Sequence, residues 1–103
     1  MSPKEYRVRV VGPQVWDPAS DNVDVEVALA DGSRFGATFF TLKNIERLFQ
    51  KNRDTGECGG GIYLWAANMI LVQELTIEAI QKTVRDLLDT EEFYSAFSRF
   101  GEP

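Results

Sequence analysis

Cys58 is the side chain best suited to nucleophilic chemistry, because it is the single thiol of a chain that has no histidine. Without imidazole, the Ser-His-Asp and Cys-His arrangements that move protons near neutral pH are excluded. A reactive thiol needs a pKa lowered by a nearby cation or helix start. Glu57 precedes Cys58, however, and the next basic residue is Lys82. We therefore expect an ordinary loop cysteine.

The carboxylates do not form a recognisable metal-binding or hydrolytic motif. Zinc sites are built from histidines or several thiolates, which this chain lacks. Four aspartates come early in the chain, at Asp17, Asp21, Asp24 and Asp31. Their spacing is not that of a calcium-binding EF-hand loop. A carboxylate pair that hydrolyses glycosidic bonds needs a cleft, for which a short chain has little material. We predict no metal, no cofactor and no enzymatic activity.

The glycine-rich run from Gly56 to Gly61 invites comparison with phosphate-binding loops. Such loops follow a strand, open a helix and, in one class, end in Gly-Lys-Ser/Thr. Here the run is followed by Ile62-Tyr-Leu-Trp65, a strand-like pattern without a basic residue. We predict either a flexible connection or a place where the backbone approaches its neighbours closely. A small enzyme or ligand-binding domain that uses this loop and Cys58 stays open as an alternative.

The bulk composition predicts one globular domain over residues 1–103. The chain is 44% hydrophobic and 26% charged, and its length is typical of a single domain. A lone cysteine cannot form an internal disulfide, and the polar first residues do not resemble a secretion signal. No stretch approaches the ~20 apolar residues of a membrane-spanning helix. These features predict a cytoplasmic protein that does not bind membranes.

The net charge of −5 comes entirely from the second half of the chain. Residues 1–55 hold eight basic and eight acidic side chains, whereas residues 56–103 hold three basic and eight acidic ones. Acidic surfaces repel nucleic-acid phosphates, so we expect no nucleic-acid partner. Such a surface steers basic protein partners, although in many domains it only supports solubility.

The first half of the chain predicts a strand followed by a hairpin and a helix. Residues 6–11, 23–29 and 34–40 alternate as half-buried strands do. Asp31-Gly32 predicts a type I′ turn between the second and third strands. Thr41 is placed to cap a helix over about residues 42–52. The apolar stripe of this helix consists of Leu42, Ile45, Leu48 and Phe49.

The second half predicts another hairpin and two helices. Residues 62–65 and 69–72 are short apolar runs, read as paired strands. Thr76 caps a helix over residues 77–88, and a shorter helix starts at Glu91 with Phe93, Phe97 and Phe100 as its stripe. The predicted order is β-β-β-α-β-β-α-α. The fold class is α+β, an antiparallel sheet of about five strands with helices packed on one face.

Four segments resemble a group of small acidic bacterial proteins that mostly carry no assigned function. The resemblance rests on Val25–Gly32, Ala37–Leu48, Thr55–Cys58 and Tyr63–Trp65, and covers about residues 22–88. This group is similar to the immunity proteins encoded beside bacterial polymorphic toxins. The resemblance implies a cytoplasmic, non-enzymatic protein that acts by occluding a toxin, and it transfers no site residues.

Two kinds of side chain are candidates for partner binding. Tryptophan and tyrosine in partly exposed positions are typical interface anchors, and a dense group of carboxylates attracts a basic partner. The candidates are Trp16, Asp17, Tyr63, Trp65, Asp86, Asp89, Glu91 and Glu92. Trp16 is equally well interpreted as a lid over a sheet edge. Tyr63 and Trp65 alternate with Ile62 and Leu64 along a predicted strand, so only one of these two pairs is expected to face outward.

The sequence therefore predicts a non-enzymatic protein-binding domain, an immunity-type inhibitor of a basic partner. An oligomeric accessory subunit is the further alternative, because the apolar residues 62–72 must be covered. If the terminal helices do not cover them, we expect a homodimer.

Overall fold

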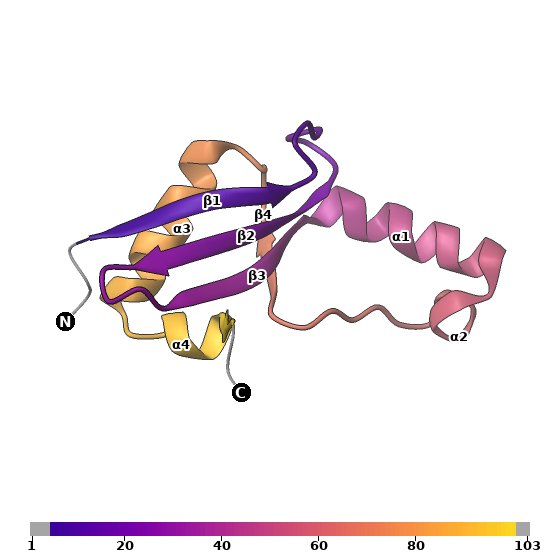
Figure 1. The fold of residues 1–103 in the computed structure, drawn as a ribbon. Helices are drawn as coiled ribbons and strands as arrows, with labels where there is room; N and C mark the ends of the chain where they lie inside the picture. The colour runs from indigo at the N-terminus through magenta and orange to yellow at the C-terminus, as the bar shows by residue number, and fades with distance from the viewer. Residues whose placement is uncertain (1–4, 101–103) are drawn as a thin grey trace.

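A computed structural model describes residues 5–100 (Figure 1). The first three strands run antiparallel in sequence order: β1 (Tyr6–Gly12), β2 (Asn22–Leu29) and β3 (Arg34–Thr41). Their predicted positions are confirmed. The hairpin between β2 and β3 is also confirmed, but the turn is not type I′. Gly32 has a positive φ of 89° and Asp31 does not, so a longer loop closes the hairpin.

The rest of the sheet differs from the predicted second hairpin. β4 (Met69–Val72) pairs parallel with the end of β3, and β5 (Ser98–Arg99) pairs antiparallel with its start. Residues 62–65 form no strand. The run at 69–72 pairs with the buried strand β3, which leaves residues 62–65 without a neighbouring strand. The α+β class with a mostly antiparallel five-stranded sheet is confirmed, whereas the predicted element order is corrected at this point.

Helix α1 (Leu42–Thr55) begins where its sequence predicts and extends to Thr55, past the predicted end at about residue 52. Thr41 accepts a hydrogen bond from the Asn44 backbone N–H at 3.1 Å. Gly56 ends the helix in the left-handed conformation, with a φ of 85°. The chain then reverses through α2 (Glu57–Gly61), a short turn in which Cys58, Gly59 and Gly60 have non-helical φ and ψ angles.

The helices α3 (Ile77–Asp89) and α4 (Phe93–Ala96) cover one face of the sheet (Figure 1). The Thr76 hydroxyl caps α3 by accepting a hydrogen bond from the Ala79 backbone N–H at 3.0 Å. The helix predicted from Glu91 is shorter than expected. Phe97 leaves the helical conformation, so Phe100 lies in extended chain over Gly36, where a Cβ atom would have no space.

The core lies between this face of the sheet and the two helices. Phe93 is at its centre, stacked on Phe97 at a ring-centroid distance of 4.5 Å and edge-on to Phe35 at 5.2 Å. The other buried apolar side chains come from β2, β3, α3 and the chain before it: Val23, Val25, Val27, Ala37, Phe39, Leu75, Ile80, Val84 and Leu88.

Residues 42–68 project beyond the end of the sheet (Figure 1). They consist of α1, α2 and a return segment without regular structure that brings the chain back to β4. We call residues 42–68 the arm, and the remaining described residues the body. The projecting arm gives the molecule principal extents of 45 × 31 × 25 Å. Within residues 5–100, no helix has the length and apolar character to cross a membrane.

Candidate partner-binding surface

The arm exposes large apolar side chains to solvent. Ile62 is 80% exposed and Trp65 is 71% exposed, both in the return segment. Leu42 at the start of α1 and Tyr63 are each more than half exposed. We call these four residues the arm surface. Three of them, Ile62, Tyr63 and Trp65, lie within one short segment, and grouped exposed apolar residues are typical of interaction sites.

The apolar stripe of α1 is not buried against the body. Its predicted stripe contains no fully buried residue: Leu42 is exposed, and Ile45, Leu48 and Phe49 are only half-buried. The two buried side chains of α1 are instead the polar Asn44 and Asn52. The expectation that helices pack on one face of the sheet therefore holds for α3 and α4, and α1 departs from it.

The base of the arm is held by polar contacts to the body. Thr41 is fully buried, and its hydroxyl accepts a backbone hydrogen bond from Asp21 at 3.3 Å in addition to the one that caps α1. Arg47 donates to the Ser20 hydroxyl at 2.9 Å from the second turn of α1. These contacts fix the direction in which the arm leaves the sheet, so its apolar residues are presented on an anchored element.

The close packing of the chain at the tip of the arm accounts for the glycine at position 61. A Cβ atom at Gly61 would lie 2.8 Å from the Phe49 carbonyl oxygen and 2.7 Å from Arg53 Cγ, so only glycine permits this close approach. Cys58 is half-buried in the turn with a φ of 51°. Glu57 beside it forms an ion pair with Lys51 at 3.6 Å. The glycines thus allow a tight reversal of the chain against α1.

The predicted anchors fall in different places. Tyr63 and Trp65 belong to the arm surface. Trp16 is half-buried against the core, and its Nε1 donates to the Leu75 carbonyl at 2.6 Å, so it occupies the position of a lid. Asp17 is exposed, and its carboxylate accepts a hydrogen bond from the Ala19 backbone N–H within its own turn.

The four predicted carboxylates lie near the end of α3, on the body and away from the arm (Figure 1). All four are exposed. Asp86 forms an ion pair with Lys82 at 3.6 Å, and Glu92 accepts a hydrogen bond from the Thr90 hydroxyl at 2.9 Å. Asp89 and Glu91 also take part in interactions. The structure therefore separates the aromatic and acidic halves of the predicted site.

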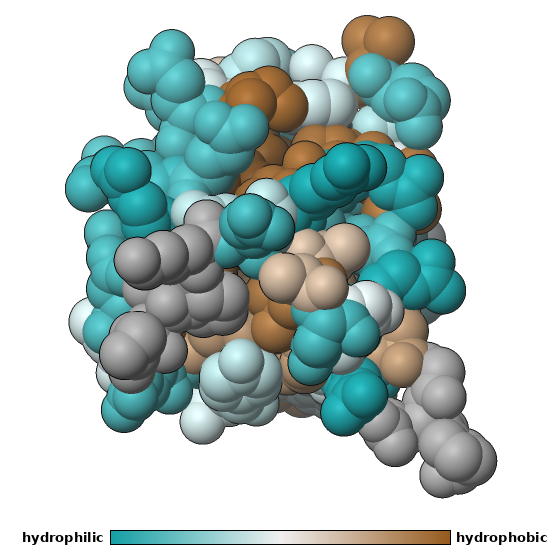
Figure 2. Space-filling model, turned by 60° about the vertical axis from the view of Figure 1, so that its left-hand side comes forward, coloured by the Kyte–Doolittle hydropathy of each residue, from teal (hydrophilic) through white to brown (hydrophobic). Residues whose placement is uncertain are grey.

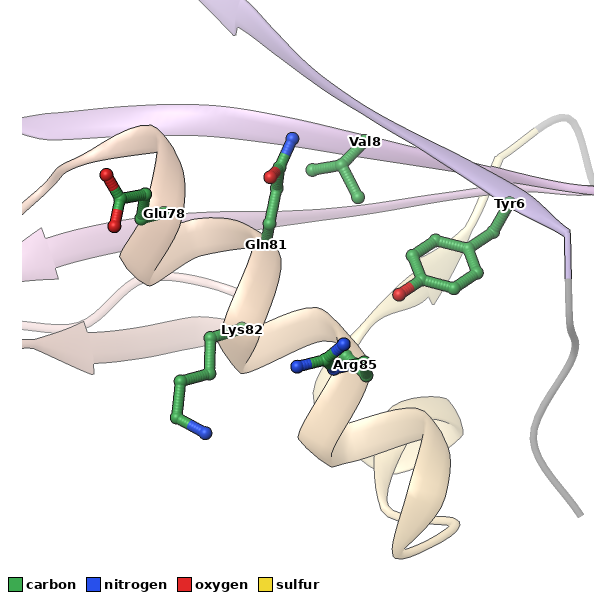
Figure 3. A pocket seen from close by; sticks show the side chains of 6 residues that line it. All are labelled: Tyr6, Val8, Glu78, Gln81, Lys82 and Arg85. Carbon is green, nitrogen blue, oxygen red and sulfur yellow. The ribbon is translucent and has the colours of Figure 1, made fainter.

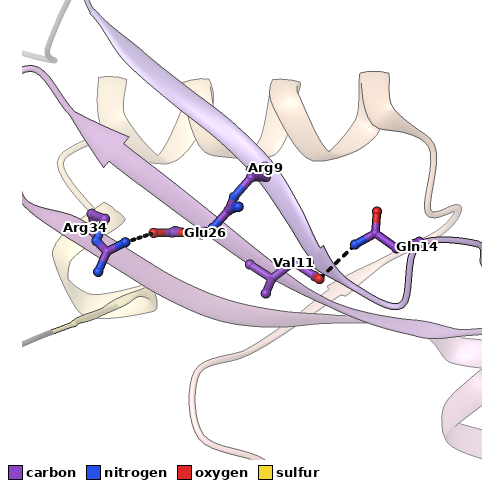
Figure 4. A network of polar contacts seen from close by, with 5 residues as sticks. All are labelled: Arg9, Val11, Gln14, Glu26 and Arg34. Atoms are coloured by element: carbon purple, nitrogen blue, oxygen red, sulfur yellow. Dashed lines mark hydrogen bonds and ion pairs between the residues drawn. The ribbon is translucent and has the colours of Figure 1, made fainter.

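The face of the sheet opposite the helices carries a polar group that the sequence did not reveal. Glu26 of β2 is only 6% exposed and forms ion pairs with Arg9 and Arg34 (Figure 4). Arg9 lies directly opposite Glu26 in the β1–β2 register. Beside this group is a cleft of about 450 Å³, bordered by Asp24 and Phe100.

A second cleft lies between β1 and α3, with a volume of about 490 Å³ (Figure 3). Its lining combines Tyr6 and Val8 of β1 with Glu78, Gln81, Lys82 and Arg85 of α3. Carboxylate and cationic groups are mixed there, so the lining does not select a ligand of one charge. Among residues 5–100, no group of three or more histidine, cysteine, aspartate or glutamate side chains is arranged to hold a metal ion.

Figure 2 shows the side of the body that faces away from the arm. Hydrophilic side chains cover most of this view, and hydrophobic atoms appear between them in the middle.

Comparison of the chain with protein-family models, curated proteins and solved structures finds no match.

Proposed function

We propose that this chain is a non-enzymatic protein-binding domain that contacts its partner through the arm surface. The observation that carries the proposal is the exposure of Ile62 and Trp65 on an arm anchored to the body. Burial of apolar area is the main favourable contribution to protein association, and tryptophan and tyrosine dominate the energetics of interfaces. Contact with another protein removes these side chains from water.

The finer proposal is an immunity-type inhibitor that occludes a basic partner. It is supported by the carboxylates near the end of α3, where Asp86, Glu91 and Glu92 are all exposed. Long-range attraction between opposite charges accelerates the encounter of two proteins. In this arrangement the acidic end of the body, apart from the arm surface, attracts and contacts the basic partner.

Site-specific photo-crosslinking in cells tests the proposal. A photoreactive phenylalanine analogue replaces Trp65 on the arm, Tyr94 near the acidic end, or Gln81 on α3 as the control. We expect protein crosslinks from position 65 and none from position 81. Crosslinks from position 94 to a basic protein would support the inhibitor, and their absence would contradict it. If position 65 yields no protein crosslink, the arm is not a binding surface and the proposal is wrong.

The Cys58→Ser variant tests the enzyme alternative. We expect this variant to fold and to give the same crosslinks from position 65, because the thiol contributes to the turn and not to chemistry. If the variant retains its thermal stability but loses the crosslinks or a cellular phenotype, the Cys58 thiol takes part directly in the function of the protein. That result would favour an enzyme or ligand-binding domain.

A further inference from the structure

We infer that the arm surface binds a second copy of this chain, giving a two-fold dimer joined through the arms. The inference rests on the proposed function, because it names the partner of the same surface. In a two-fold dimer the same surface of each copy meets the other, so the surface must be self-complementary in both shape and charge. The distribution of charge and the available area both fit this requirement.

The charge of the arm differs from that of the rest of the chain. Residues 42–68 carry four basic and three acidic side chains, a net charge of +1. The other residues carry seven basic and thirteen acidic side chains, a net charge of −6. Two copies therefore repel each other through their bodies and can approach most easily through their arms. A strongly basic partner is drawn to the acidic body instead, whereas a contact between two nearly neutral arms meets little charge repulsion.

The exposed apolar area of the arm supplies part of what a stable dimer needs. The four residues of the arm surface and the exposed Leu71 of β4 are spread along the arm and its base, and together present roughly 500–600 Å² of side chain. A stable interface buries about 800 Å² on each partner. The half-buried side chains of Ile45, Leu48 and Phe49 can supply part of the remainder.

The edge of the sheet next to the arm is also open. β4 pairs with β3 on one side and has no other partner strand among the described residues. Such an edge presents unpaired backbone groups that a second copy is able to cover. The sequence predicts a dimer if the terminal helices leave both apolar runs uncovered. Ile62, Tyr63 and Trp65 of the first run are exposed, whereas Ile70 and Val72 of the second run pack against the core.

Sedimentation equilibrium of the full chain tests the inference. We expect dimers at tens of micromolar. Ile62→Ser and Trp65→Ser should each weaken dimerisation by roughly 10- to 100-fold, because each removes a central apolar anchor. Val15→Ser is the matched control: Val15 is 87% exposed on the body, so its removal should not change the dissociation constant. A chain that is monomeric at about 100 µM, or a dimer that the arm variants do not weaken, would overturn the inference.

The salt dependence gives a second readout. Raising the salt from about 50 to 500 mM screens the repulsion between the two acidic bodies, so the dimer should become several-fold tighter. Dissociation at high salt would show a contact between opposite charges and would overturn the arm-to-arm arrangement.

A spin label on the single thiol, Cys58, reports on the same contact. We expect a dipolar distance between two labels that is lost when labelled protein is diluted with unlabelled chains. No dipolar coupling in samples that sediment as dimers would place the two tips far apart and contradict packing of the arms along each other.

The crosslinking experiment separates this inference from the proposed function. Crosslinks from position 65 to a second copy support both. Crosslinks only to a different protein, with a monomeric chain in the centrifuge, overturn the dimer and leave the binding domain standing. Absence of crosslinks together with a monomer overturns both.

Discussion

The body and the arm use similar sequence patterns with different results. In the body, the stripe of α3 meets the inward side chains of β2 and β3, and Ile80, Val84 and Leu88 become buried. In the arm, α1 carries a comparable stripe, but none of its residues is fully buried, and the chain returns from α2 to β4 without regular structure. An amphipathic helix thus predicts that a partner exists, while the chain topology decides whether that partner is within the same molecule.

The largest expected difference between the two regions is the effect of removing an aromatic ring. Phe93→Ala should lower the free energy of unfolding by about 3–5 kcal/mol, because it leaves a cavity at the centre of the core. Trp65→Ala should change it by less than about 0.5 kcal/mol in dilute, monomeric samples. Urea denaturation measures both. Similar losses from the two variants would mean that the arm belongs to the same cooperative core.

The open face of the sheet should respond less strongly than the core. Glu26→Ala removes ion pairs with Arg9 and Arg34, and should cost about 1–2 kcal/mol, because both arginines are more than half exposed and regain water. A double-mutant cycle of Glu26→Ala with Arg34→Ala isolates one pair. A coupling energy near zero would show that burial of Glu26 does not depend on Arg34.

The two helix caps allow a finer comparison. Thr76→Ala should cost about 1 kcal/mol, as the loss of a helix cap usually does, and Thr41→Ala should cost more. Thr76→Ala should accelerate hydrogen exchange throughout the body, because α3 is part of the core. Thr41→Ala should accelerate it mainly in α1, with a larger loss than the cap alone, since its hydroxyl also accepts the Asp21 hydrogen bond. Uniform acceleration by Thr41→Ala would contradict the distinction between arm and body.

The smallest effect concerns the hairpin turn of the body. Hydrogen bonds from Ser33 lower the pKa of the Asp31 carboxyl below 3.8. The unfolded chain therefore binds this proton more readily, so the contribution of Asp31 to stability is present above pH 3.8 and is lost as the pH falls through the lower pKa of the folded state. Thermal melts between about pH 2 and pH 6 should show a slightly weaker acid dependence for Asp31→Asn than for the parent. An unchanged profile would contradict this.

Local patterns predict most elements of this fold because their causes are local. Alternation defines β1, β2 and β3, and Thr41 and Thr76 cap the helices that follow them. Residues 62–65 are different. Their composition favours a strand, but a strand requires a neighbouring edge, and the sequence alone does not show that α1 carries the chain beyond the sheet.

The candidate site follows the same division. Exposure of Tyr63 and Trp65 is consistent with their predicted role as anchors. Ile62 and Leu42 are not among the predicted anchors, because apolar residues in a regular pattern are expected to be buried. The burial of Glu26 depends on two arginines from different strands. Opposite charges at paired positions of neighbouring strands are the signal that would have revealed it.

The pairing of β3 with β4 has a consequence for how this chain can change. Thr41 ends β3 and Met69 begins β4, and the two strands are direct neighbours in the sheet. Residues 42–68 are therefore an excursion that leaves and re-enters the fold at one place. Insertions or deletions within such an excursion leave the sheet register intact, because the entropy of closing a loop grows only slowly with its length. The length of the arm and the sequence of its tip can thus diverge between related chains while the body keeps its structure.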